Sequence, residues 1–263
     1  MPDIALIIAG FAVGLIVGLT GVGGGSLMTP ILIFFFGVKP YMAIGTDLLF
    51  AAFTKMGGTL SMARQRLIPW RVVGQLCAGS LPAALMTLYV LHRLGPADPA
   101  VQSAMTSTLG VALLLTAAAM LYKAARGKQL PRVLSDDQLD QAMNARHWSL
   151  PVLFGAVIGT LVTLTSVGAG AIGVSVLLLL FPMLPLPRIV AADIAYAVPL
   201  TLVAGLGHAS LGSVDWPLLA QLLAGSLPGI WLGSRLMSRT PERLVRSLLS
   251  LLLAYAGTKL IAI

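Results

Sequence analysis

Residues 69–82 read PWRVVGQLCAGSLP, and residues 215–228 read DWPLLAQLLAGSLP. Eight of the fourteen positions are identical at an offset of 146 residues, and the same offset carries Asp47 onto Asp193. Self-similarity at a fixed spacing is the mark of a duplicated structural unit. The sequence therefore predicts a chain built from two similar halves.

A glycine-rich stretch near the start of each half extends the repeat. The first reads LTGVGGG over residues 19–25, and the second reads LTSVGAG over residues 164–170. Glycine accepts backbone angles that other residues resist, so we expect each half to open with a broken helical hairpin, followed by three transmembrane helices. A polar linker at residues 123–149 separates a first repeat at residues 1–122 from a second at residues 150–263.

The composition predicts an all-α integral membrane protein. The 263 residues are 57% hydrophobic and only 10% charged, with a mean hydropathy of +0.93, whereas soluble domains carry about 25% charged residues. A helix needs about 20 apolar residues to cross the bilayer core, and the second leg of each hairpin is short of that length. Each hairpin therefore either crosses the whole bilayer or enters it and returns to the same side. The predicted segments are residues 4–20, 26–38, 41–62, 72–92 and 101–122, then 150–165, 171–185, 189–208, 217–236 and 244–263.

Lysine and arginine orient the two halves in opposite directions. Loops rich in these residues stay cytoplasmic, which places the linker inside, and counting back two spans also places Arg64, Arg66 and Arg71 inside. The equivalent loop of the second half, residues 209–216, has no lysine or arginine. We therefore predict an inverted-topology repeat, a design common among secondary transporters, in the cell inner membrane with both termini outside.

The two breaks are the predicted binding region. A backbone unwound inside a membrane is tolerated where protein or water surrounds it, and the N–H groups of the helix that follows favour an anion. Nearby hydroxyl groups add hydrogen-bond donors. The alternative is that these glycines only let helices pack closely. The predicted substrate-binding residues at the breaks are Thr20, Gly21, Gly23, Gly24, Gly25, Ser26, Thr165, Ser166, Gly168 and Gly170.

Ionisable residues within spans are costly, so each is a functional candidate. Asp47 and Asp193 lie one to two turns inside equivalent spans and are the predicted proton-coupling residues. Lys55 lies near the middle of the first of these spans and is predicted to balance the charge of the substrate; it is eight residues from Asp47, about 80° around the helix, so the two should not pair directly. Tyr196 is predicted to line the same site. The alternatives are that the aspartates tie helix ends, that Lys55 snorkels to the interface, and that Tyr196 is an interfacial aromatic.

Three further side chains have simpler interpretations. Trp70 and Trp216 are equivalent by the repeat and are predicted to be interfacial anchors. His208 falls at the predicted outer end of its span, where we expect it to be solvated.

Several function classes are disfavoured. Residues 168–173 match the dinucleotide-binding pattern GxGxxG, but no strand is expected before them and the equivalent stretch lacks the third glycine. Cys77 and three histidines are too few for a closed zinc site. The protease patterns GxSG and HExxH and a Walker A motif are absent from the sequence. We expect no catalytic residue, metal, cofactor or nucleic-acid partner, and we interpret the net charge of +8 as a topology signal.

Four short features combine along the chain. They are GVGGG at residues 21–25, AIGTD at residues 43–47, VDW at residues 214–216, and the two GSLP stretches. Together they resemble the TauE/SafE family of sulfite exporters over essentially the whole chain. The resemblance implies transport of sulfite, sulfonates or related organic anions. Many members of that family have serine where this chain has Asp47, and the second half has Ala-Ala-Asp at residues 191–193 in place of a Gly-Thr pair.

These observations together predict a secondary transporter that moves a small anion by proton-linked alternating access about the two breaks. Its expected partners are the substrate anion, protons and the lipid bilayer. A passive anion channel, an intramembrane enzyme and an assembly factor are the alternatives.

Overall fold

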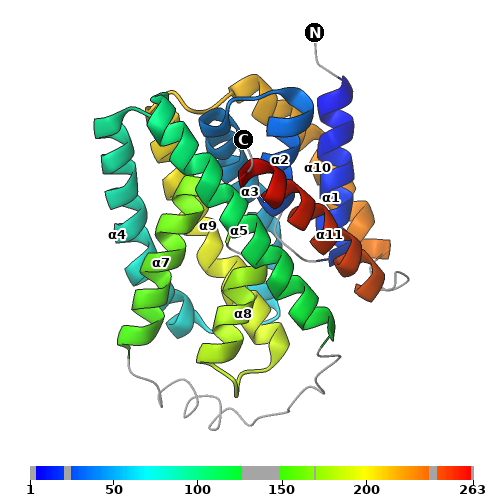
Figure 1. Cartoon of the computed structure of the whole chain (residues 1–263). Helices are drawn as coiled ribbons and strands as arrows, with labels where there is room; N and C mark the ends of the chain where they lie inside the picture. The colour runs from blue at the N-terminus through cyan, green and yellow to red at the C-terminus, as the bar shows by residue number, and fades with distance from the viewer. Residues whose placement is uncertain (1–3, 21–24, 126–147, 169, 237–241, 262–263) are drawn as a thin grey trace.

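A computed structural model describes residues 4–20, 25–125, 148–168, 170–236 and 242–261. Within these ranges the chain is helical and contains no strand (Figure 1). The helices are α1 (Ile4–Thr20), α2 (Gly25–Phe36), α3 (Pro40–Arg64), α4 (Trp70–Leu94), α5 (Pro99–Ala125), α7 (Ser149–Thr165), α8 (Ala171–Leu180), α9 (Leu186–Ser210), α10 (Trp216–Leu236) and α11 (Glu242–Ile261). The predicted all-α fold class is confirmed, with a helix at each predicted segment.

Proline and glycine set several of the helix boundaries. Pro40 lies in the first turn of α3, where its missing N–H would have no helical partner. Gly95, with φ 83°, ends α4. The helix α8 ends at Leu180, five residues before the predicted end of that segment at 185, because Pro182 cannot continue a helix and disfavours helical angles in the residue before it.

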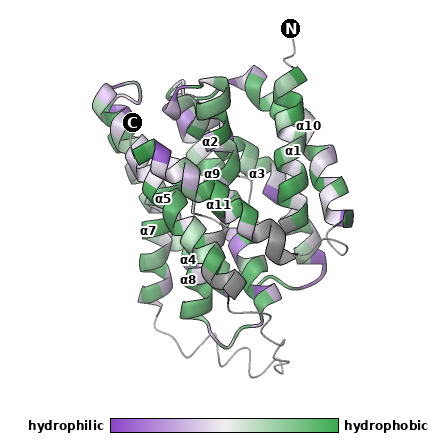
Figure 2. Ribbon diagram, turned by 45° about the vertical axis from the view of Figure 1, so that its right-hand side comes forward, coloured by the Kyte–Doolittle hydropathy of each residue, from purple (hydrophilic) through white to green (hydrophobic). Residues whose placement is uncertain are grey.

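Helix length and surface character fit a multi-pass membrane protein. Three described helices are long and apolar enough to cross a membrane by length and composition: Trp70–Leu94, Pro99–Leu121 and Leu186–Ser210. The outer surface carries large apolar side chains, with Phe35 82% exposed and Leu179 74% exposed, and Figure 2 shows hydrophobic residues along most of the helix lengths. Such an apolar surface is rare on a soluble monomer, so lipid is the solvent for these helices.

The main helix pairs each join one half of the chain to the other. The helix α1 packs along α10, and α7, the repeat equivalent of α1, packs along α4, the equivalent of α10. The equivalent helices α3 and α9 pack against each other, and so do α5 and α11. This set of pairs is unchanged when the two halves are exchanged.

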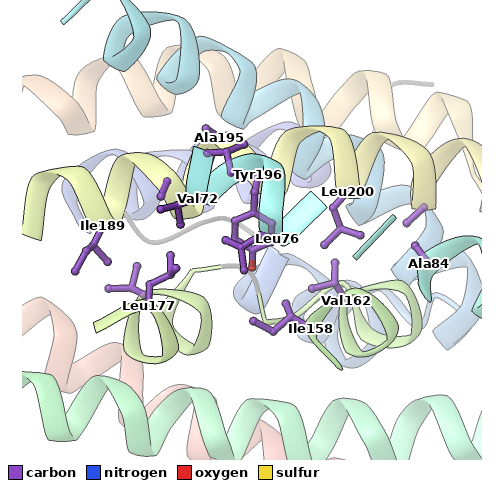
Figure 3. Close-up of a cluster of buried hydrophobic side chains, with 14 of the residues drawn as sticks. Val72, Leu76, Ala84, Ile158, Val162, Leu177, Ile189, Ala195, Tyr196 and Leu200 are labelled. Carbon is purple, nitrogen blue, oxygen red and sulfur yellow. The ribbon is translucent and has the colours of Figure 1, made fainter. Parts of the chain in front are cut away.

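Two buried apolar clusters surround the middle of the protein. One lies where α9 meets α4, α7 and α8 (Figure 3), and the other lies among α1, α2, α3, α5, α10 and α11. The helix α3 contributes to both, with Ile44 and Leu48 in the first and Leu49 and Phe50 in the second.

Glycines within the helices allow the closest helix pairs. Several glycines on α1, α10, α4 and α7 lie directly against the backbone of the facing helix, and a Cβ atom added at any of them would collide with it. The set is Gly10, Gly14 and Gly18 on α1, Gly225, Gly229 and Gly233 on α10, Gly79 on α4, and Gly155 and Gly159 on α7. Small residues at such spacing let membrane helices approach closely. Close packing is therefore the role of these glycines, which lie outside the breaks.

Gly79→Ala is expected to destabilise the protein by about 3 kcal/mol, at the upper end of ordinary single substitutions. The added methyl group would strike the backbone carbonyl of Val152 on α7, and backbone cannot give way as a flexible side chain can. Gly74→Ala in the same helix is the matched control, because a Cβ there meets nothing within 4 Å and alanine favours a helix by about 1 kcal/mol. Thermal unfolding in detergent measures both variants. Equal melting temperatures for the two variants would contradict the packing account.

Candidate functional site

The three ionisable side chains predicted within spans are buried close to one another. Asp47 is 0% exposed, Lys55 7% and Asp193 2%. Asp47 and Lys55 lie on α3, which packs against α9 with Asp193. Lys55 interacts electrostatically with both carboxyl groups, and its burial places it inside the protein rather than at the interface. We call Asp47, Lys55 and Asp193 the charged cluster.

Asp47 connects the first hairpin to the second break. The Thr29 hydroxyl on α2 donates a hydrogen bond to Asp47 Oδ2, and Thr29 is itself fully buried. The Ser166 hydroxyl, from the second break, also lies close enough to interact with Asp47, although it makes no hydrogen bond of standard geometry. The partners of Asp47 therefore come from both halves of the chain.

Sequence reasoning missed Thr29, although a signal was present. Thr29 corresponds to Ser175 at the offset of 146 residues that relates Asp47 to Asp193. Each half thus carries a hydroxyl residue one turn into the second leg and an aspartate 18 residues later. That paired spacing could have indicated a hydroxyl donor for the carboxylate.

The predicted break in the second half is present. The helix α7 ends at Thr165 and α8 begins at Ala171. Between them Ser166 has φ 58°, and Gly168 and Gly170 have φ 132° and 137°, a region that L side chains adopt only with strain. A serine held at such an angle in a buried site is a feature found at functional positions.

Thr165 shapes this break through its own backbone contacts. Its hydroxyl lies 2.7 Å from the carbonyl oxygen of Leu161, to which it donates. It also accepts a hydrogen bond of 3.1 Å from the N–H of Val167. The Thr165 hydroxyl is therefore engaged within the break, whereas Ser166 faces the charged cluster.

Gly173, in the first turn of α8, makes room for two oxygen atoms from α9. A Cβ atom at this position would strike Asp193 Oδ1 and would lie 3.1 Å from the Tyr196 hydroxyl. Tyr196 is fully buried, and its hydroxyl has no hydrogen-bond partner within the described part of the chain. Figure 3 shows this hydroxyl directed from α9 toward the connection between α7 and α8. Tyr196 is thus a core residue beside the second break and does not face lipid.

The first break is described only at its edges. Gly21, Gly23 and Gly24 lie outside the described residues. Thr20 is the last residue of α1, and Gly25 is the first residue of α2. Ser26 follows in the first turn of α2 and is buried.

His208 lies in the protein core, so the expectation that it is solvated is wrong. It is 0% exposed, and its Nε2 lies 3.0 Å from the carbonyl oxygen of Thr163, so the Nε2–H donates there. The chain after α9 folds back over it: the Ser213 N–H donates to the His208 carbonyl at 2.9 Å, and the Asp215 N–H donates to Thr46 Oγ1 at 3.0 Å. Among the described residues, no three His, Cys, Asp or Glu side chains are grouped so that they could hold a metal ion.

The two repeat-related tryptophans lie on the surface of the protein. Trp70 is 63% exposed and Trp216 is 56% exposed. Both begin their helices, α4 and α10. Their exposure leaves both rings accessible to lipid headgroups, and the role of interfacial anchor stays a prediction.

Comparison with known proteins covers nearly the whole chain. The model of the family described as "Sulfite exporter TauE/SafE" matches residues 6–260. The probable membrane transporter protein YjnA of Bacillus subtilis (strain 168) is 37% identical over 259 residues, which are 98% of this chain and 100% of that protein. The probable membrane transporter protein YunE of the same organism is 25% identical over 275 residues, covering 99% of this chain and 98% of that protein. No solved structure matches the chain.

Proposed function

The chain belongs to the sulfite exporter TauE/SafE family, and from this membership we propose that it is a secondary transporter moving a small anion across the inner membrane. The substrate class is sulfite, a sulfonate or a related organic anion. Transport is linked to protons and proceeds by alternating access. The family supports membrane transport as the class of function, the buried cluster supports a proton-linked anion site, and the arrangement of the two halves supports alternating access.

The observation that carries the proposal is the charged cluster beside the second break. Charged side chains inside a membrane protein are costly and are found mainly on substrate and ion pathways. Here one lysine interacts with two carboxyl groups, and the buried hydroxyls of Ser166 and Tyr196 lie near them. A cation with hydroxyl donors can bind an anion, and carboxylates can carry protons.

The arrangement of the two halves supports alternating access. In Figure 1, α1 begins at the top and α2 lies toward that end, whereas α7 begins at the bottom and α8 lies toward the bottom. Together with helix pairs that are unchanged by exchange of the halves, these directions support an inverted repeat. In such a repeat each half can take the conformation of the other, which opens the central site to one side at a time.

Purified protein in lipid vesicles tests the transport proposal. Vesicles loaded with sulfite, a sulfonate or a carboxylate are diluted, and the entry of a labelled trace of the same anion is followed. A carrier gives counterflow of labelled anion, and an imposed pH gradient changes net flux. Flux as fast as channel conduction and independent of the pH gradient would favour the passive channel and contradict the proposal.

Cysteine labelling tests the inverted topology. In a Cys77→Ala background, Ser210→Cys at the end of α9 is expected to react with a membrane-impermeant maleimide from outside intact cells. Gln65→Cys, after α3, is expected to react only after permeabilisation. Both positions are exposed, so access to the reagent depends on the side of the membrane. Labelling of both cysteines from the same side would exclude the inverted repeat.

A further inference from the structure

The first turn of α8 combines a helix start with an unpartnered buried donor. Within the described residues no side chain caps α8, whose N-cap residue is Gly170. The Gly173 N–H already donates to the Gly168 carbonyl at 3.0 Å, so it is the N–H groups of residues 171 and 172, at the very start of the helix, that have no earlier turn to bond. The Tyr196 hydroxyl lies 3.1 Å from the position of a Cβ at Gly173 in this turn, is fully buried and has no partner within the described residues. A helix start and a free hydroxyl at one point favour an anion there.

A carboxylate of the protein already lies at this point. Asp193 Oδ1 is the nearest atom to a Cβ placed at Gly173, so it occupies the space beside the first turn of α8. An incoming anion would lie next to it. Two negative charges in contact in a buried site repel strongly, and protonation of Asp193 removes that repulsion.

The charges near Asp193 determine which way protons move. Among the interactions described, Lys55 on α3 interacts with both Asp193 and Asp47, and Tyr196 on α9 interacts with Asp193 and with Cys77 on α4. Tyr196 and Cys77 are neutral in their ordinary protonated forms, so one lysine and two ionised aspartates give a net charge of −1. Binding of one proton brings the cluster to zero, and an anion then enters a neutral site that retains a lysine and a hydroxyl donor.

We propose that the protein is a proton–anion symporter, in which a proton on Asp193 accompanies the anion held at the first turn of α8 by Tyr196 and Lys55. The inference rests on the proposed transport function and adds the direction of proton movement: proton and anion cross the membrane in the same direction. The proton comes from water on the side where the anion enters, binds the Asp193 carboxylate, and leaves to water on the other side together with the anion. By linkage, each ligand raises the affinity for the other by the same factor.

Asp193 is assigned this role, rather than Asp47, because of where its oxygen lies. Asp47 Oδ2 accepts the Thr29 hydrogen bond on α2, whereas Asp193 Oδ1 lies against the α8 turn itself. Replacement of either aspartate by asparagine leaves the cluster neutral with all groups ionised. Only Asp193 directly competes with the anion for its place.

The sign of proton movement tests the inference. Wild-type protein is reconstituted in vesicles of phosphatidylethanolamine and phosphatidylglycerol, and methanesulfonate is the first probe because its charge does not change with pH near neutrality. When methanesulfonate enters the vesicles, the external medium is expected to become alkaline, and half-saturation is expected to improve by up to about tenfold per pH unit of acidification. If sulfite is transported and methanesulfonate is not, the same external alkalinisation is expected with sulfite, once the pH change caused by the buffering of sulfite itself has been subtracted.

Two variants locate the effect. Asp193→Asn is expected to retain counterflow and to lose alkalinisation, with Asp98→Asn, on the exposed α4–α5 connection, as the matched control. Tyr196→Phe is expected to raise the half-saturating methanesulfonate concentration about tenfold, as for loss of one hydrogen bond to a charged group, without changing the protons moved per anion. Tyr255→Phe, which is 66% exposed, is its control.

The outcomes separate this inference from the transport function. Absence of counterflow for every anion in the wild-type protein would overturn both. Counterflow with external acidification, or with no proton movement, would overturn symport alone. Alkalinisation retained in Asp193→Asn, or an unchanged half-saturation in Tyr196→Phe, would overturn the assignment of the site.

Discussion

Replacement of Lys55 by alanine is expected to abolish anion transport and to destabilise the protein by about 3–5 kcal/mol, the cost of removing one partner from a buried charge cluster. Lys55 is buried and interacts with both Asp47 and Asp193. Without it, the two carboxylates lose the cation that interacts with both of them, and the substrate loses the positive charge that attracts it. Flux in vesicles and thermal unfolding in detergent measure the two effects separately.

Controls for the lysine separate its structural role from its role in transport. Lys39→Ala removes an exposed lysine at the start of α3 and is expected to leave both measurements unchanged. Adding Asp47→Asn and Asp193→Asn to Lys55→Ala removes the uncompensated charge, so stability should recover while transport stays absent. Wild-type flux in the single Lys55→Ala variant would remove the lysine from the anion site.

Asp47→Asn is expected to eliminate the dependence of transport on a pH gradient while leaving the protein folded. The asparagine oxygen can still accept the Thr29 hydrogen bond, so α2 stays attached to α3. The substitution removes one negative charge, so Lys55 pairs with Asp193 alone and holds it ionised. The anion then enters without a proton, against the repulsion of Asp193, and is expected to bind more weakly. Accumulation of anion against its gradient should fall to background while counterflow continues.

A second substitution separates the charge of Asp47 from its hydrogen bond. Thr29→Val keeps the carboxylate and removes the donor, leaving a buried oxygen unsatisfied at a cost of about 1–3 kcal/mol. Proton dependence is expected to persist in Thr29→Val and to be absent in Asp47→Asn. Proton-driven accumulation at the wild-type level in Asp47→Asn would show that this carboxylate is not part of the coupling.

Local sequence signals were sufficient to predict the helices and to identify the residues of the charged cluster. Apolar runs of helical length predicted every described helix, because lipid forces each buried segment to satisfy its own backbone hydrogen bonds. The glycines of residues 164–170 predicted the break between α7 and α8, since Gly168 and Gly170 adopt angles that other residues resist. Asp47, Lys55 and Asp193 stood out because charge is rare in apolar spans.

Contacts between helices could not be predicted from local sequence signals in the same way. The repeat spacing of Thr29 and Asp47 could have indicated a pair, but whether their side chains meet depends on how α2 packs against α3. His208 looked solvent-exposed because it ends a span, but the α9–α10 connection folds over it through Ser213. Gly10, Gly14 and Gly18 show close-packing spacing in the sequence, whereas the facing helix, α10, became known only from the fold.

The central claim is that a small anion binds beside the charged cluster at the start of α8. The most direct measurement is an experimental structure of the full-length protein with a brominated sulfonate, in which the anomalous signal of bromine locates the ligand. The account predicts the sulfonate group in contact with Lys55 Nζ and the Tyr196 hydroxyl, with Gly173 behind it. A ligand located only on another surface of the protein, with this turn of α8 unchanged and unliganded, would contradict the account.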